Sequence, residues 1–272
     1  MLDELKSFLK VLLLAVIVII GITVFSTVLD FFFPKDTSPK DIKTEIIDKE
    51  YEYGAIVRFG TYYTGELTED GKEEIAPIEW RIAGSTDDNS KVLLVTNHAI
   101  DAQPYNNSEK PINWCDCSLR QWLNNDFYNI AFSDEDKKYI ALSETRYYVG
   151  EGSKKDTVND YVFIPDFYFS SLNDESGISE CTPTKLAYEH GAVSWTSAQG
   201  RHLSTREINI KNGSDYNDSA HCYYWFQGDE DDICRAARLS VGQGNFRTIH
   251  SIVPEPNDMS IGVRPEIWIN MS

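Results

Sequence analysis

The chain has 272 residues and a formal net charge of −18 at pH 7. Residues 1–40 are neutral, because four lysines balance four carboxylates there, so residues 41–272 carry the whole negative charge. A domain this acidic repels phosphate backbones, and the composition therefore argues against nucleic acid as a partner.

The N-terminal part of the sequence is strongly apolar. Val11–Phe33 contains one charged residue, Asp30. A helix over this stretch would be roughly 35 Å long at about 1.5 Å per residue, and the hydrocarbon core of a bilayer is about 30 Å thick. We therefore expect a short tail over residues 1–10, a transmembrane helix over residues 11–33 and a charged linker over residues 34–50. The alternative, a cleaved secretory signal, would need a shorter apolar core and small residues at a cleavage site.

The orientation of this helix is the next question. Lysines on both sides leave the positive-inside count undecided, and large domains cross a membrane largely regardless of their charge. A short N-terminal tail before a long C-terminal domain more often stays inside. We therefore expect a single-pass protein of the cell membrane whose one domain, residues 51–272, is extracellular.

Three strands are predicted first in this domain. Ala55–Tyr63 is apolar and aromatic, and Lys91–Thr96 follows a turn-rich segment. Between them, Ile78–Ala83 alternates apolar residues with Glu79 and Arg81, which indicates a half-buried strand. The order favours an antiparallel meander.

Helical patterns follow. Ser118 can cap a helix over residues 119–131, and Ser133 can open a second helix. Thr182–Gly191 has a threonine cap, a proline at the first helical position and a terminal glycine. Short strands punctuated by glycine end in Ile261–Met271. The sum predicts an α+β fold.

Four segments in this order carry a resemblance to a known family: PIEWRI (Pro77–Ile82), SLRQWLNNDFYNIAF (Ser118–Phe132), CTPTKLAYEHGA (Cys181–Ala192) and GVRPEIWI (Gly262–Ile269). Together they resemble a bacterial family of surface domains, common in gut Firmicutes, that is known only as a domain of unknown function. The LRxWLN helix and the terminal GVRP strand are the strongest strings. The resemblance covers residues 53–271.

That family in turn is similar to the C-type-lectin-like fold of the formylglycine-generating enzymes, or sulfatase-modifying factors. The resemblance therefore implies a C-type-lectin-like domain. One stretch departs from the family pattern, because Tyr223–Gly228 stands where the family tends to carry Trp-Trp-Leu-Arg-Ser. The copper-binding cysteines of those enzymes have no counterpart here that can be matched residue by residue, so no catalytic residue is carried over.

The loops between residues 220 and 257 are the predicted binding site. Aromatic residues make 12% of the chain, and exposed aromatic rings beside carboxylates are a common way to stack on sugars. The candidate ligand contacts are Trp225, Asp229, Glu230, Arg264 and Trp268. Two structural alternatives stay open: the aromatics can cover a loop-rich core, and Arg264 can clamp the last strand through an ion pair or backbone carbonyls.

The acidic run within these loops is the weak candidate for a metal site. Asp229, Asp231 and Asp232 lie close together in sequence, and a bound calcium ion would relieve their repulsion. Hydration of a solvated loop would do the same, so no cofactor is firmly predicted. Of the five cysteines, Cys222 and Cys234 are the candidate disulfide, since a hairpin could join them.

These observations lead to two hypotheses about function. The first is a membrane-anchored extracellular module that binds a protein or a carbohydrate without catalysis. The alternative is an exported enzyme with an unrecognised site, assisted by a metal if the acidic run binds one.

Overall fold

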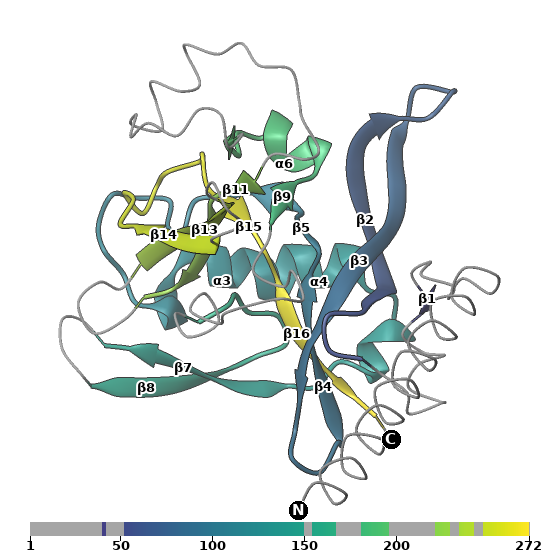
Figure 1. Ribbon diagram of the computed structural model, residues 1–272, viewed down its shortest axis with the longest axis horizontal. Helices are drawn as coiled ribbons and strands as arrows, with labels where there is room; N and C mark the ends of the chain where they lie inside the picture. The colour runs from purple at the N-terminus through teal and green to yellow at the C-terminus, as the bar shows by residue number, and fades with distance from the viewer. Residues whose placement is uncertain are drawn as a thin grey trace, which may run out of the picture. The chain divides into compact units, whose positions relative to one another are not determined.

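Two long strands dominate the computed structural model, which describes residues 40–41, 52–149, 154–166, 181–195, 221–228, 234–241 and 247–271. β2 (Ile56–Leu67) and β3 (Glu73–Ser85) form an antiparallel hairpin, and its far end projects from the neighbouring elements in Figure 1. Contacts within the chain separate residues 1–38 from residues 39–272, and every described residue belongs to the second unit.

The hairpin is part of the first of two five-stranded sheets. The strand order is β1-β2-β3-β4-β16, with β1 (Lys40–Asp41), β4 (Lys91–Thr96) and β16 (Glu266–Asn270). β2, β3 and β4 are consecutive and antiparallel, which confirms the predicted meander. The alternation in β3 is also confirmed, because Ile78, Trp80 and Ile82 are all buried.

The second sheet has the order β14-β13-β12-β15-β6. Its strands are β6 (Asp101–Ala102), β12 (Tyr224–Gln227), β13 (Cys234–Val241), β14 (Arg247–Ile252) and β15 (Gly262–Val263). β12 runs parallel to β15, and the other pairs are antiparallel. The chain passes from this sheet to the first one between β15 and β16, through Arg264 and Pro265.

Three two-stranded pairs complete the β structure of the described residues. β5 (His98–Ala99) is parallel to β9 (Thr182–Pro183). β7 (Ser143–Tyr148) is antiparallel to β8 (Lys155–Asp160), and β10 (Ser194–Trp195) is antiparallel to β11 (His221–Cys222).

The longest helical stretch spans residues 118–131 in three parts, after the 3₁₀ turn η1 (Trp114–Asp116). These parts are α3 (Ser118–Trp122), the π-helical η2 (Leu123–Phe127) and α4 (Tyr128–Ala131). The N-cap is Cys117 rather than the predicted Ser118, and its sulfur accepts the Arg120 N–H at 3.4 Å. The wider π turn shifts the residues that follow it. Ala131 is therefore buried, and Ile130 is 49% exposed, although regular α-helical spacing would place Ile130 on the same face as Leu123 and Phe127.

The other two predicted helices are shorter than expected. Ser133 is followed only by a 3₁₀ turn, η3 (Asp136–Lys138), whose N-cap is Glu135, and Ser133 exchanges reciprocal bonds with Asp136. The segment predicted as a helix from Thr182 to Gly191 contains only α6 (Lys185–Glu189), which Thr184 caps by accepting the Ala187 N–H. The reason is that Thr182 and Pro183 pair with β5 as a strand.

The fold class predicted from the sequence is therefore wrong. Over the ranges given above, the protein is mostly β, and the α+β, C-type-lectin-like description does not hold. None of the helices in those ranges is both long and apolar enough to cross a bilayer. The predicted spanning helix, residues 11–33, and the linker that follows it, apart from the two residues of β1, lie outside the described residues.

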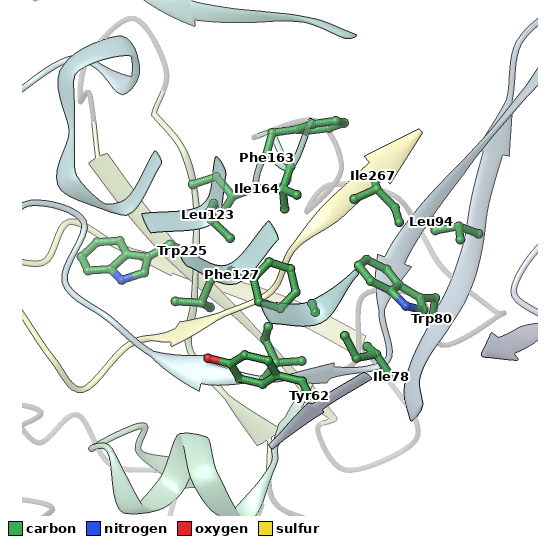
Figure 2. Packing of buried hydrophobic residues seen from close by; sticks show 14 of the residues in the cluster. Tyr62, Ile78, Trp80, Leu94, Leu123, Phe127, Phe163, Ile164, Trp225 and Ile267 are labelled. Atoms are coloured by element: carbon green, nitrogen blue, oxygen red, sulfur yellow. The ribbon is translucent and has the colours of Figure 1, made fainter. Parts of the chain in front are cut away.

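The main core lies between the helical stretch and the two sheets. Figure 2 shows Phe127 of η2 close to Tyr62 of the first sheet, and the ring centroids of these two residues are 5.2 Å apart. The indole N–H of Trp80 donates to the Phe59 carbonyl at 2.8 Å, and that of Trp225 donates to the Gln103 carbonyl at 2.8 Å. Buried indoles need such acceptors, so backbone carbonyls satisfy them without bringing further polar side chains into the core.

A buried carboxylate ties β8 to the helical stretch. Asp160 accepts the Trp114 indole N–H at 2.8 Å and Arg120 Nε at 2.6 Å. We expect Asp160→Ala to lower the free energy of unfolding by about 3 kcal/mol, because it leaves the Nε–H of the half-buried Arg120 and the buried indole N–H of Trp114 without acceptors. Urea unfolding of the full chain measures the change. Asp87→Ala, in the exposed β3–β4 turn, is the control and should change stability by less than about 0.5 kcal/mol. Equal losses in both variants would contradict the assignment.

Candidate ligand groove

The structure places the predicted aromatic contact, Trp225, in the core. Its side chain is fully buried, and its ring lies 5.6 Å from that of Tyr105. It supports the fold and offers no surface for stacking. Trp268 is half-buried on β16 and packs against the main core cluster.

Arg264 follows the structural alternative. Its side chain is fully buried, its Nε donates to the Thr96 carbonyl at 2.9 Å, and its guanidinium lies 5.1 Å from the centre of the Tyr224 ring. The arginine thus clamps the crossing between the two sheets. The buried side of this crossing also holds Glu266, whose pKa is raised to about 8 by burial and by the charge of Asp166, against the opposing effect of Arg264.

The acidic run lies outside the described residues. Asp229, Glu230, Asp231 and Asp232 therefore stay predictions, both as ligand contacts and as a calcium site. Within the described ranges, no group of three or more histidine, cysteine or acidic side chains is arranged to hold a metal ion.

The backbone register does not bring the predicted disulfide pair together. Cys234 lies opposite Gln227, five residues beyond Cys222. At about 3.3 Å per residue this separates the two Cα atoms by roughly 16 Å, whereas a disulfide needs less than about 7 Å. The sulfur that lies next to Cys222 is that of Cys181, at 4.0 Å.

A groove that the sequence did not predict lies between the β2–β3 hairpin and the start of α6. Its volume is about 510 Å³, and its walls come from β2, β3, β5, Ile100 and the residues that open α6. Apolar and aromatic side chains line much of it: Tyr62, Tyr63, Ala76, Pro77, Ile78 and Ile100. The rings of Tyr62 and Tyr63 meet edge to face, with centroids 5.4 Å apart. Tyr62 is buried, and Tyr63 stays half-exposed.

Charged pairs lie among the groove residues. Lys185 Nζ reaches from α6 to the Glu66 carboxylate of β2 at 2.7 Å, and Arg58 lies 3.5 Å from Glu79. These side chains are partly exposed, so the pairs add little stability and can exchange partners with a ligand. They give the groove a polar rim around an apolar floor.

His98 forms part of the wall as a neutral ring. Burial lowers its pKa. The Oδ1 of Asn97 accepts the Arg81 Nε–H. The amide nitrogen of Asn97 therefore faces His98, and it donates to His98 Nε2 at 3.1 Å. His98 Nδ1 therefore carries the proton and donates to the Thr182 hydroxyl at 2.8 Å. This network fixes β5 against β9 at the base of the groove.

A buried carboxylate behind the groove joins three elements. Asp101 of β6 accepts the Tyr62 hydroxyl at 3.0 Å and lies 2.6 Å from Nδ1 of His190, at the end of α6. Burial and the Asp101 charge raise the pKa of Tyr62, so its hydroxyl stays protonated. The arrangement holds α6 and β2 at a fixed separation. No local sequence motif predicts this arrangement, because Tyr62, Asp101 and His190 are far apart in the chain.

Gly65 sets how closely the hairpin approaches α6. It has a positive φ of 83°, and a Cβ placed there would lie 2.4 Å from the Leu186 nitrogen. A glycine inside a strand often marks such a close backbone approach. This is the one sequence signal that could have pointed to the groove.

The effect of this contact can be separated from the effect of the backbone conformation. Gly71 has a similar φ of 78° but no atom within 4 Å of a Cβ. We expect Gly65→Ala to be less stable than Gly71→Ala by about 1–3 kcal/mol, because only the first variant forces β2 away from α6. Thermal unfolding of both variants measures the difference. Equal destabilisation would show that the approach to Leu186 does not constrain the hairpin.

The raised pKa of Glu266 predicts a dependence of stability on pH. A folded-state pKa near 8, above the ordinary value of 4.5, means that stability is fully present below about pH 4.5 and is lost as pH rises through 8. Glu266→Gln removes this loss. We therefore expect the Tm of the variant, relative to the unmodified chain, to rise from pH 5 to about pH 8 and then to level off, because above pH 8 Glu266 is ionised in both the folded and the unfolded chain. A Tm difference that does not change with pH would contradict a neutral Glu266.

Comparison with known proteins gives one match. The model of a family described as a domain of unknown function (DUF6273) matches residues 89–271, which include three of the four strings on which the sequence resemblance rests. No curated protein matches the chain. No solved structure matches it either, so the expected likeness to formylglycine-generating enzymes receives no support.

Proposed function

The chain belongs to a family described only as a domain of unknown function (DUF6273), and from the geometry of the groove we propose that it is a non-catalytic binding module. Its ligand in this proposal is a basic segment of a partner protein that also carries apolar side chains. The main support is that an apolar, tyrosine-lined groove lies directly beside a strongly acidic hairpin.

The groove has the features of a seat for side chains. Its floor is apolar, its volume suits a few side chains, and its half-exposed Tyr63 offers a ring face with a polar tip. The contact of Gly65 with α6 and the Tyr62–Asp101 bond keep its walls in place without a ligand. A preformed site spends less binding energy on ordering its own residues.

The hairpin arm, defined as residues 64–76, supplies the charge. It carries five carboxylates, at Glu66, Glu69, Asp70, Glu73 and Glu74, and one cation, Lys72. All six of these side chains are exposed. Two large apolar side chains are exposed among them, Leu67 at 67% and Ile75 at 56%. A partner that matches this surface brings lysine or arginine together with apolar residues.

The two surfaces divide the work of binding. The arm attracts a basic segment before contact, because the field of exposed carboxylates extends over a screening length of about 10 Å at moderate salt. The groove then buries the apolar side chains of that segment, which sets the lifetime of the complex. The extracellular location of the domain stays a prediction, since it depends on residues outside the described ranges.

Selection of random displayed peptides on the immobilised full chain tests this proposal. The selected peptides should be rich in lysine or arginine with apolar residues between them, and rising salt should weaken their binding. We expect Tyr63→Ala to reduce their affinity about tenfold, equivalent to about 1.4 kcal/mol, because it removes the ring from the groove. Fluorescence polarisation with a labelled selected peptide measures the change.

Tyr148→Ala is the matched control. Tyr148 is also a half-exposed tyrosine, but it lies on β7, outside the groove, and contacts Lys155. Its removal should leave the affinity unchanged. Acidic selected peptides, or equal losses in both variants, would contradict the proposal. Binding to a glycan array that Tyr63→Ala abolishes would instead assign the groove to a carbohydrate.

A further inference from the structure

Two cysteines that are far apart in sequence meet in the described structure. Cys181 lies immediately before β9, and Cys222 is the last residue of β11. The Cys222 backbone N–H donates to the Cys181 carbonyl at 2.8 Å, and the Cys222 thiol donates to the Cys181 sulfur, with the two sulfur atoms 4.0 Å apart.

The surroundings of the pair are apolar and closely packed. Cys181 and Cys222 are at most 1% exposed and form one buried cluster with Ala99 and Tyr224. A Cβ at Gly262 would lie 2.6 Å from the Ala99 Cβ, so this glycine leaves room for Ala99, and the same Cβ position lies in ordinary van der Waals contact with the Cys222 sulfur, at 3.5 Å. The two sulfur atoms therefore face each other in a closely packed space, where the Cys181 thiol also lies 3.9 Å from the Thr182 carbonyl oxygen.

We propose that Cys181 and Cys222 are a disulfide-forming pair that covalently links β9 to β11. The bond from the Cys222 N–H to the Cys181 carbonyl holds the two residues side by side, as in a hydrogen-bonded pair of antiparallel strands, where the Cα atoms lie about 5.5 Å apart, within the range of natural disulfides. A disulfide bond is about 2.05 Å long, so the sulfur atoms must approach by about 2 Å. Rotation of the two side chains provides this movement without a change in the strands.

The co-reactant is another disulfide, either a small-molecule disulfide or that of an exchange catalyst. The Cys181 thiolate attacks one of its sulfur atoms, which forms a mixed disulfide and expels the first thiolate. Cys222 then loses its proton and attacks the Cys181 sulfur, which expels the second thiolate. Two electrons pass to the co-reactant, and the two thiol protons end on its released sulfur atoms.

The electrostatics of the site agree with these roles. The bond donated by Cys222 and the charge of Arg264 lower the pKa of Cys181, while burial and Cys181 itself raise the pKa of Cys222. In the assembled pair, Cys181 is therefore the sulfur that favours the thiolate form. Because both sulfur atoms are buried in the folded domain, the exchange belongs to folding, before β11 covers Cys181.

The bond would close a loop of about 40 residues that includes α6. Thr184 and Lys185, which line the groove, lie close to Cys181 in this loop. The disulfide thus fixes one wall of the groove. The proposal does not depend on what the groove binds.

Peptide mapping of the full chain, refolded in a mixture of oxidised and reduced glutathione, tests the pair. We expect a cross-linked peptide that contains Cys181 and Cys222 and is two hydrogen atoms lighter than the reduced pair. In denaturant without reductant, alkylation should then modify the three cysteines that remain of five. Alkylation of all five, or a link between Cys222 and Cys234, would overturn the proposal.

Thermal unfolding gives a second readout. Oxidised chain should have a Tm about 5–10 °C above that of chain kept in reductant, because the bond restricts the unfolded state. Cys181→Ser combined with Cys222→Ser should abolish this difference, and Cys115→Ser, which removes a cysteine outside the pair, should keep it. The same difference in the double variant would overturn the proposal. The peptide map decides the question even if the double variant fails to fold.

Discussion

A guanidinium group removed from water costs several kcal/mol unless neighbouring groups replace its hydration. At the crossing between the two sheets, the buried Arg264 meets this cost with the Thr96 carbonyl, the face of the Tyr224 ring and further partners. Thr96 in turn donates its N–H to the Pro265 carbonyl. Side-chain and backbone hydrogen bonds thus stabilise the crossing together. These bonds fix the segment between β15 and β16, which lets the two strands join different sheets.

The sites discussed above depend on this crossing. The segment that follows Thr96 carries His98 and Ile100, and the Ile100 N–H donates to the Val263 carbonyl, directly before Arg264. One wall of the groove is therefore positioned by the same joint. The charge of Arg264 also acts to lower the pKa of Cys181 and of Glu266. The buried guanidinium of Arg264 favours a thiolate at Cys181 and opposes the neutral carboxyl form of Glu266.

The β2–β3–β4 meander of the first sheet could be predicted because its signals are local, whereas the pairing of β1 and β16 with it was not predicted. Ile78, Trp80 and Ile82 alternate with polar residues, and one face of β3 is buried, as that pattern implies. The same rule failed at Tyr223–Trp225. Alternation would place every second side chain of this segment outside, but all three are buried, because other elements cover the segment on both sides. Period-two patterning identifies a half-buried strand and carries no information about a strand covered on both faces.

Other failures have a different physical origin. The helix signal at Thr182–Gly191 was sound as local chemistry, yet the pairing of Thr182 and Pro183 with β5 overrode its first turn. The groove has no local signature, since β2, β5 and α6 come from distant parts of the sequence. For Arg264, the sequence correctly offered a carbonyl clamp as an alternative to ligand contact. The burial of Arg264 decides between the clamp and the ligand contact. No local sequence pattern indicates that an arginine is buried.

The distribution of carboxylates connects the fold with the proposed role. The buried acids Asp101 and Asp160 each have hydrogen-bond donors, and Glu266 escapes the cost of a buried charge through its raised pKa. Much of the excess negative charge therefore lies at the surface, where hydration lowers the free energy of each charged group. The arm carries a high density of these surface carboxylates. Five exposed carboxylates along one hairpin repel each other, so the arm gains free energy whenever a cation approaches. A basic partner relieves this repulsion and meets the apolar groove beside it, which is why both features favour the same class of ligand.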